Sequence, residues 1–550
     1  MYSRQARPVA SPNVLAPLSH HSNRERARSL RPDVYDDATQ MKKRISVREG
    51  NSGILHIRHE DATEERHIPN YDLDEARHLL LRFQELRDGE GSYLKDNYWC
   101  EGTNWLPTVV NYLYGRIFGN YVRYRPLLKQ LIDGELEVAL ENQGELATIV
   151  DILEGQGGSR FLKPRLFNGL MLFNNWLTVR RYRAEVLFFR FTPDDFRTTA
   201  AKSTLDELGV RYMEALGVSK RLLLTNVFRR KPYYFYGGVP IENSFGLDYD
   251  LSGVDKYTAV LFTAALRKIE RMISAYIREQ KWHVRALTSS EFKTFYGIDD
   301  TQVIFPLLYA CQQHQIHTVA HQHGACYNKY HASYVMEGIN GTECRWFDKL
   351  ITWGEFWRDR VLAVSEWYSP DRIVVGCDLF EPRRVSRSEQ TEGRRNILIP
   401  YEFLTNTYAV GRYITKLIDL GYSVFFKQRP DESLEDQIDA YCLPIGYPER
   451  LTIIEEITPR AMENIDIVAG TASTLIYQLL VYGKPTWFLE TDYKWMEDLV
   501  ELGHARLVRY EDLETLDDSY FEPTDADPKY LFSSEALLDT MQKHVLAGET

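Results

Sequence analysis

Residues 466–491 read DIVAGTASTLIYQLLVYGKPTWFLET, and this stretch is the clearest fold signal in the chain. An apolar run at 466–469 is followed at once by small and hydroxyl residues, and then by a helical pattern at 474–482. Gly483 and the Lys and Pro after it end this helix and begin another apolar run. Strand, turn, helix and strand in this order predict part of a parallel sheet that helices cover.

The same alternation extends upstream of this stretch. Together with 466–469, five short apolar runs alternate with helical patterns in this part of the chain. This alternation predicts a compact Rossmann-like domain over 396–535. The remaining runs lie at 396–400, 423–427, 451–455 and 485–489, and the further helical patterns at 409–420 and 459–463. A charged stretch, EPRRVSRSEQTEGRR at 381–395, is predicted to be a linker.

The region before the linker alternates in the same way, which predicts a second Rossmann-like domain over 141–380. We expect its strands at 185–191, 222–224, 283–288, 317–321, 349–353 and 372–376, and helices at 257–280 and 302–313. The predicted fold class is therefore α/β, with two Rossmann-like domains facing each other across a cleft.

The N-terminal part differs in character. Residues 1–40 are rich in Arg, Ser and Pro and predict a disordered leader, and 41–140 predict a small accessory α+β region. Within it we expect a hairpin at 45–59 and a helix at 71–87. The segment 105–132 mixes Tyr, Phe, Leu and Arg at roughly helical spacing, broken at Pro126. We interpret it as a helix half buried against its own domain, with a helix lying at a membrane surface or an acceptor groove as the alternative.

The composition excludes several classes of protein. The chain has 550 residues, of which 44% are hydrophobic and 26% charged, and its 66 basic against 78 acidic residues argue against a nucleic-acid coating protein. Its six cysteines form no CxxC pair, which excludes a zinc ribbon and a dense disulfide framework. No signal peptide or membrane-spanning run is apparent. We expect a cytoplasmic protein, with peripheral contact with the inner membrane as the alternative.

The turn after 466–469 carries the sharpest chemical signal. Gly470, Thr471, Ser473 and Thr474 lie where a strand passes directly into a helix. Free backbone N–H groups and the positive end of the helix converge there, so the turn predicts an anion site. The alternative is that Ser473 and Thr474 only cap the helix.

Two cations follow the strand predicted at 423–427. Lys427 and Arg429 are two residues apart on an extended chain, so they share a face and both can reach one diphosphate. They lie at the carboxyl end of a strand, which is where open α/β sheets bind ligands. The alternative is an ordinary charged surface loop.

The first Rossmann-like domain offers three candidates for a general base. His323 follows the strand predicted at 317–321 and precedes a glycine, while Glu101 and Glu291 are acids in short loops. His321 and His323 alternate faces, and no third ligand lies at a matching spacing. We therefore predict no metal site.

Several segments taken together resemble a known family. They are HQHG (321–324), TWGEFWRD (352–359), VVGCDLF (374–380), KQRPDE (427–432) and AGTASTLIYQLLVYGKP (469–485). As a set they resemble bacterial glycosyltransferases of the two-Rossmann GT-B type that build capsular and surface polysaccharides, a group that includes sialyltransferase-like, Kdo-transferase-like and polyol-phosphate-polymerase-like enzymes. The resemblance covers roughly 185–500.

The resemblance implies a metal-independent glycosyltransferase without a cofactor, whose nucleotide-sugar donor is a substrate. The acceptor would be an oligosaccharide, a polysaccharide or a lipid-linked glycan, and no nucleic acid would bind. The turn with Thr471, Ser473 and Thr474 would contact the donor, and Arg429-Pro430 replaces the usual His-Pro pair. A nucleotide-sugar 2-epimerase and a polyol-phosphate transferase on the same scaffold are the alternatives.

Overall fold

The computed structural model describes most of the chain outside its N-terminal forty residues. The described residues are 43–49, 54–59, 62–68, 72–142, 144–155, 164–193, 195–229, 231–237, 247–298, 304–325, 346–365, 367–379, 395–402, 405–429, 433–447, 449–471, 473–491, 497–523 and 528–547. The predicted leader at 1–40 and all but the last residue of the predicted linker lie outside them.

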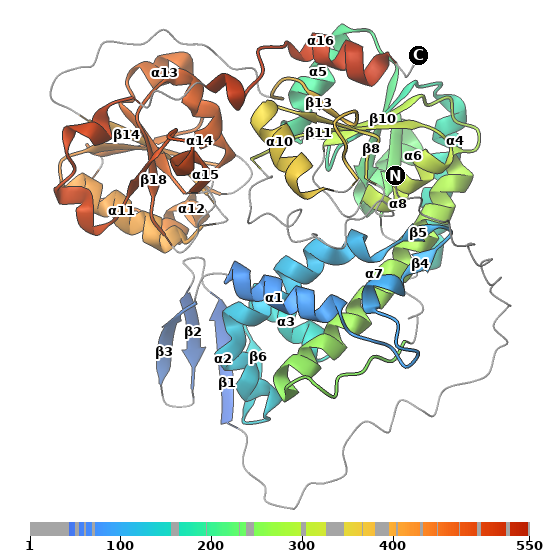
Figure 1. Cartoon of the computed structure of the whole chain (residues 1–550), viewed down its shortest axis with the longest axis horizontal. Coiled ribbons are helices and arrows are strands. Elements are labelled where there is room, and N and C mark those ends of the chain that lie inside the picture. The colour runs from blue at the N-terminus through green and yellow to red at the C-terminus, as the bar shows by residue number, and fades with distance from the viewer. Residues whose placement is uncertain are drawn as a thin grey trace, which may run out of the picture.

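The N-terminal accessory unit combines a small sheet with a helical layer (Figure 1). The sheet has the order β3-β2-β1-β6, in which β1 pairs antiparallel with β2 and parallel with β6. The predicted hairpin is thereby confirmed, and Asp72 caps α1 by accepting a hydrogen bond from the Glu75 N–H. The elements are β1 (Lys43–Glu49), β2 (Ile54–Arg58), β3 (Thr63–His67), α1 (Leu73–Gln84), β4 (Trp99–Cys100), β5 (Thr103–Asn104), α2 (Asn120–Ile132), β6 (Leu136–Leu140) and α3 (Glu145–Leu153).

The aromatic segment 105–132 forms the core of this unit. It consists of a 3-10 turn η3 (Leu106–Val109), a π-helix η4 (Tyr112–Gly119) and α2. Trp105, Ile117 and Phe118 are fully buried, so a membrane surface is the wrong interpretation of this segment. The predicted break at Pro126 is also wrong, because α2 continues through the proline with one backbone hydrogen bond fewer.

The second unit is built on a seven-stranded parallel sheet with the order β13-β12-β11-β10-β7-β8-β9. β7 lies inside the sheet and all four of its residues are buried, which is the pattern of a parallel strand covered on both faces. The elements are α4 (Pro164–Arg181), β7 (Val186–Phe189), α5 (Thr199–Glu207), β8 (Tyr212–Gly217), α6 (Lys220–Arg229), β9 (Tyr233–Tyr236), α7 (Lys256–Leu287), β10 (Thr294–Ile298), α8 (Phe305–Gln313), β11 (His317–His321), β12 (Lys349–Thr352), α10 (Glu355–Val364) and β13 (Ile373–Val375).

Two strands predicted for this unit are wrong. Residues 222–224 lie in α6 and 283–288 form the end of α7, a helix of 32 residues. Glu279, His283 and Leu287 are all buried at a spacing of four, so the short apolar run is the last inward stripe of a long helix. The true strands here are β8, β9 and β10. The long helix α7 packs on the accessory unit and on helices α4 and α8 of the second unit (Figure 1).

The C-terminal unit is a six-stranded parallel sheet with the order β16-β15-β14-β17-β18-β19. The five predicted strands and the helices between them are confirmed, and β19 is an additional strand at the edge. The elements are β14 (Asn396–Pro400), α11 (Thr407–Asp419), β15 (Ser423–Lys427), α12 (Leu434–Tyr441), β16 (Leu451–Ile454), α13 (Pro459–Glu463), β17 (Ile467–Gly470), α14 (Thr474–Leu479), β18 (Thr486–Leu489), α15 (Glu497–Glu501) and β19 (Arg506–Val508).

The C-terminal unit has an apolar core of its own, and some of its buried side chains, including Tyr477, join the core of the second unit. Trp357 of α10 packs against Tyr477 of α14, with ring centroids 5.4 Å apart. The chain after β19 then returns to the second unit, where the Trp357 indole N–H donates to the Leu531 carbonyl and Thr294 donates to the Val545 carbonyl. This return passes through short turns η8 (Glu511–Glu514), η9 (Asp518–Phe521) and η10 (Pro528–Tyr530), and through α16 (Leu537–Met541) and η11 (Gln542–Leu546).

The fold class is thus α/β with two Rossmann-like domains and a small N-terminal accessory unit, as predicted. In both parallel sheets the strand order reverses once, between β7 and β10 and between β14 and β17. Ligands of open α/β sheets bind beyond the carboxyl ends of the strands at such reversals. Among the described helices, none is long and apolar enough to cross a membrane.

Candidate functional site

The carboxyl edge of the C-terminal sheet brings the predicted donor residues together. Pro400 at the end of β14 is in register with Lys427 at the end of β15. β17 lies on the other side of β14, and the pairing of Leu398 with Val468 puts Gly470 level with Pro400 two residues later. Neighbouring strands are about 4.8 Å apart, so Lys427 and Gly470 lie about 10 Å apart on one edge.

The turn after β17 does bind an anion, and that anion belongs to the protein. The carboxylate of Glu402 accepts hydrogen bonds from the Thr471 N–H at 2.9 Å and from the Ser473 N–H at 2.8 Å. The Thr471 hydroxyl donates to the same carboxylate. Glu402 is only 4% exposed, and the Tyr441 hydroxyl bonds both its N–H and its carbonyl. The predicted anion geometry is therefore present, but an internal carboxylate uses it.

Gly470 is required for this contact. A Cβ at this position would lie 2.6 Å from a carboxylate oxygen of Glu402 and 2.3 Å from the Ile476 side chain. The close approach that we predicted for a phosphate is thus made by Glu402. Glu402 follows β14 by two residues, just as Arg429 follows β15, so the strand-end rule that selected Lys427 and Arg429 also pointed to it.

Ser473 and Thr474 have separate tasks. Ser473 caps α14, because its hydroxyl accepts from the Leu475 N–H at 3.2 Å, as in the alternative interpretation. The Thr474 hydroxyl instead accepts from the Ala325 N–H at 3.1 Å. Ala325 follows β11 of the other sheet, so this bond joins the carboxyl edges of the two Rossmann-like domains.

A second polar bond joins the domains one helical turn further on. The Gln478 side chain of α14 donates to the Asp378 carboxylate at 3.0 Å. Asp378 follows β13 and is 6% exposed. The ends of β11 and β13 therefore both meet α14, as expected for domains whose ligand-binding edges face each other.

Lys427 and Arg429 are held in different ways at this edge. The main chain of Arg429 is clamped by the buried Gln437 of α12, which accepts from its N–H and donates to its carbonyl, each at 2.8 Å. Lys427 donates to the Gln428 carbonyl. Burial lowers the pKa of Lys427, and the carboxylates of Glu455 and Glu456 act in the opposite direction.

On the facing edge, the two histidines differ in burial. The His321 ring is fully buried, and its nitrogens contact the Tyr296 hydroxyl at 3.0 Å and the Cys377 carbonyl at 2.8 Å. The His323 side chain is partly exposed, in the loop that reaches α14 through Ala325. Gln322 fixes the start of this loop by accepting from the Trp353 N–H at 3.0 Å.

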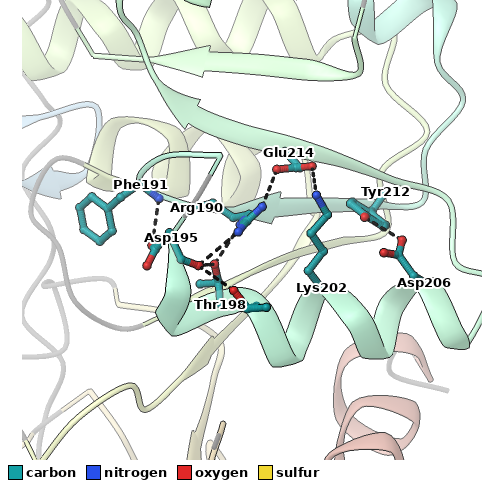
Figure 2. A network of polar contacts seen from close by, with 9 residues as sticks. Arg190, Phe191, Asp195, Thr198, Lys202, Asp206, Tyr212 and Glu214 are labelled. Atoms are coloured by element: carbon teal, nitrogen blue, oxygen red, sulfur yellow. Dashed lines mark hydrogen bonds and ion pairs between the residues drawn. The ribbon is translucent and has the colours of Figure 1, made fainter. Parts of the chain in front are cut away.

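The carboxyl end of β7 carries a buried cation that the sequence did not single out (Figure 2). Arg190 is 2% exposed and donates to Glu214 at 3.0 Å, to the Thr198 hydroxyl at 2.9 Å and to the Asp195 carbonyl at 3.2 Å. Lys202 bonds the other carboxylate oxygen of Glu214 at 2.9 Å. Because these acceptors take up both its terminal nitrogens and its Nε, Arg190 ties the end of β7 to Asp195 and Thr198 at the strand-order reversal.

The two predicted acids lie away from this meeting of edges. Glu291 precedes β10 and so lies at the amino edge of the parallel sheet, where Arg183 pairs with it at 3.4 Å. It was selected because 283–288 was predicted to be a strand. Glu101 lies in the turn between β4 and β5 and pairs with Lys281 of α7 at 3.1 Å. Figure 1 shows β4 and β5 on the opposite side of the molecule from the C-terminal sheet.

Metal ligands do not gather anywhere in the part of the chain that the structure describes. No group of three or more His, Cys, Asp or Glu side chains there is arranged to hold a metal ion.

Comparison of the sequence with known proteins finds one distant relative. No family model matches the chain. An uncharacterized protein of Methanocaldococcus jannaschii is 26% identical over 223 residues, which are 38% of this chain and 38% of that protein. The match thus spans well under half of the relative's length.

Solved structures with a similar chain path include glycosyltransferases and epimerases. MurG of Acinetobacter baumannii is 14% identical with a TM-score of 0.35, covering 60% of this chain and 86% of its own. The UDP-GlcNAc 2-epimerase of Neisseria meningitidis, bound to UDP-GlcNAc, is 13% identical with a TM-score of 0.36, covering 63% and 95%. The calicheamicin glycosyltransferase CalG4 is 10% identical with a TM-score of 0.36, covering 60% and 87%. Similarities this distant do not assign an activity to this chain.

Proposed function

We propose that the protein is a glycosyltransferase that moves a sugar from a nucleotide-activated donor to a hydroxyl of a glycan acceptor. One observation carries the proposal. The carboxyl edges of two Rossmann-like sheets meet at the bond between Ala325 and Thr474, with Lys427 and Arg429 on one edge and His323 on the other. Cations on one side and a base on the other are what a displacement at a sugar carbon with a diphosphate leaving group needs.

Lys427 and Arg429 hold the donor diphosphate in this proposal. The N–H groups of Thr471 and Ser473 are already bonded to Glu402, so the phosphates lie against the two cations and not in the turn. Arg429 has its main chain fixed by Gln437, which preorganises its position. Preorganised cations stabilise charge as it develops on the departing phosphate, without reorganisation during the reaction.

His323 acts as the general base. The acceptor oxygen bonds to the anomeric carbon of the donor, the bond from that carbon to the phosphate oxygen breaks, and the acceptor proton passes to the imidazole. A positioned base contributes about 10²- to 10⁴-fold to such a step. Glu101 and Glu291 take no part, because the first lies across the molecule and the second at the opposite edge of its sheet.

The structure gives a reason to prefer sugar transfer over polyol-phosphate transfer. That reaction would use two histidines near the phosphate, but both ring nitrogens of His321 are engaged inside the protein. An oligosaccharide, a polysaccharide of the cell surface or a lipid-linked glycan is the acceptor class that we propose, and no metal or bound cofactor is used.

The first test is a thermal-shift screen with UDP, GDP, CMP, CDP and dTDP, because a ligand bound only by the folded state raises the melting temperature. We expect one nucleotide to stabilise the wild type and to have a much smaller effect on Arg429→Ala. His323→Ala should keep the nucleotide shift and lose about 10²-fold or more in kcat with the matching nucleotide sugar.

Two carboxylate variants are the controls for this test. Glu101→Gln and Glu291→Gln should match the wild type in both nucleotide shift and turnover, since each removes only an exposed ion pair. If no nucleotide stabilises the wild type, or if Arg429→Ala responds like the wild type, the proposed donor site is wrong. Interconversion of the nucleotide sugar without an acceptor would identify an epimerase instead.

A further inference from the structure

One helix of the second unit turns apolar side chains toward the solvent. Phe173, Trp176 and Leu177 of α4 are 56%, 38% and 46% exposed. Trp176 and Leu177 follow Phe173 by three and four residues, so the three side chains lie on one side of the helix. The rings of Phe173 and Trp176 stack with their centroids 6.0 Å apart. The outward face of α4 is therefore an apolar surface.

The inward face of the same helix buries polar side chains beside the apolar Met171 and Val179, and it is fixed in place. Asn175 is fully buried and exchanges hydrogen bonds with the main chain of Phe235 in β9, at 2.7 and 2.9 Å. Asn174 accepts from Asn226 of α6 at 3.0 Å. These bonds satisfy backbone groups of the edge strand β9, so rotating α4 to bury its apolar stripe would leave them unpaired. The exposure of the stripe is thus built into the fold.

The neighbouring helix α6 also exposes an apolar side chain. Asn226 ties α6 to α4, and Leu224 of α6 is 52% exposed, with the exposed Arg221 one turn away. α4 packs against β9 and α6. Figure 1 shows α4 and α6 on the side of the sheet away from the C-terminal domain. We use the name α4–α6 face for the exposed side chains of these two neighbouring helices, which are Phe173, Trp176, Leu177, Arg180, Arg221 and Leu224.

The sequence segments that carry α4 and α6 are basic, whereas the whole chain is acidic. The chain has 78 acidic against 66 basic residues, yet residues 164–183 contain four Arg and 219–233 contain five Lys or Arg, with no Asp or Glu in either segment. The Arg180 guanidinium lies 4.0 Å from the centre of the Trp176 ring. At the margin of the face, Arg183 pairs with Glu291.

We propose that the α4–α6 face docks on the surface of a phospholipid bilayer with anionic headgroups. A helix face with Trp, Phe and Leu at its centre and arginines around them combines the two terms that hold proteins on such surfaces, burial of apolar area and attraction to anionic lipid. A second copy of the chain is a poorer occupant, because pairing the face with itself would bring arginines together. We therefore assign the membrane contact to this face and not to segment 105–132, because most aromatic side chains of that segment are buried.

Vesicle flotation tests this proposal with the full-length protein. We expect binding to vesicles of an equimolar phosphatidylcholine and phosphatidylglycerol mixture, and little binding to phosphatidylcholine alone. The double variant Phe173→Ser, Trp176→Ser should bind the mixed vesicles at least about tenfold more weakly. In the double variant Arg180→Gln, Arg221→Gln, the loss of each positive charge should lower the affinity for the mixed vesicles about fivefold.

A matched control removes apolar side chains elsewhere. Ile445 and Tyr447 of the C-terminal domain are 63% and 51% exposed, and Ile445→Ser, Tyr447→Ser should bind vesicles as the wild type does. Circular dichroism and thermal unfolding check that all three variants fold. The proposal is overturned if the wild type fails to bind the mixed vesicles, if it binds both kinds equally, or if the control loses as much affinity as the α4 variant. A dimer that Phe173→Ser, Trp176→Ser converts to a monomer would identify a self-association surface and overturn it too.

Discussion

At the residue scale, Glu402 explains how the C-terminal edge is built. Its buried carboxylate takes the N–H groups of Thr471 and Ser473 and the Thr471 hydroxyl, while Tyr441 bonds its own main chain. These contacts join β14 to β17, the two strands between which the sheet order reverses. The carboxylate therefore fixes the turn at the point where a ligand of such a sheet binds.

Glu402→Gln should destabilise the protein markedly. The variant loses the charge that these donors bond, and one side of its amide turns an NH₂ group toward backbone N–H groups. We expect the free energy of unfolding in urea to fall by about 2–3 kcal/mol. Glu101→Gln, which changes a half-exposed carboxylate paired with Lys281, should change it little. Equal effects of the two variants would contradict the role given to Glu402.

Lys427 predicts a pH dependence of donor binding. Burial lowers its pKa below the usual value, and only its protonated form attracts a diphosphate. Nucleotide affinity measured by calorimetry should thus fall as the pH rises from neutral to about 10, earlier than an ordinary lysine would allow. Lys427→Arg keeps its charge over this range and should show a flatter profile. A wild-type affinity that is constant over the range would show that Lys427 is not a ligand.

At the element scale, the C-terminal domain was the most predictable part of the chain. Its strands are short continuous apolar runs, such as β17 and β18, and each is separated from the next by a helix with clear polar ends. The misplaced strand at 283–288 shows the limit of this approach. A short apolar run with a β-branched residue is indistinguishable from the end of a long helix until its inward spacing is followed back through α7.

The packing of α11 on α12 holds Tyr441, which in turn bonds Glu402 at the site. A Cβ on Gly411 of α11 would lie 1.7 Å from the Tyr441 carbonyl of α12, and Tyr441 in turn holds Glu402. Gly411→Ala should therefore separate the helices, cost about 3 kcal/mol of unfolding free energy and weaken nucleotide binding. Gly169→Ala in α4 meets nothing within 4 Å and should be neutral or slightly stabilising. A neutral Gly411→Ala would show that α11 and α12 can separate freely.

At the scale of the whole molecule, the sequence predicted the two domains, and it predicted which edges would meet. It did so because the ends of parallel strands must lie on one edge, which brought Lys427, Arg429 and Gly470 together. The sequence did not predict the individual contacts between distant segments. Glu402 meets Thr471 across 69 residues, and Thr474 meets Ala325 across 149. Such contacts depend on which strands become neighbours, and local spacing does not encode that choice.

The ion pair between Arg360 and Asp498 also joins the two Rossmann-like domains. Arg360 of α10 lies 3.0 Å from Asp498 of α15, whose side chain is 2% exposed. Arg360→Ala should leave this buried carboxylate without that cation, cost about 3 kcal/mol and lower the unfolding temperature in calorimetry. Arg358→Ala on the same helix removes an exposed pair with Asp359 and should change it little. If both variants unfold like the wild type, the pair does not stabilise the domain contact.

The most direct test is a crystal structure with the nucleotide diphosphate that stabilises the protein best. We predict phosphate oxygens within hydrogen-bond distance of Lys427 and Arg429, about 3 Å, with Glu402 still bonded to Thr471 and Ser473. The sugar-bearing end of the diphosphate should point toward His323. Phosphates bonded to the Thr471 and Ser473 N–H groups with Glu402 displaced, or a nucleotide bound away from this edge, would contradict the account.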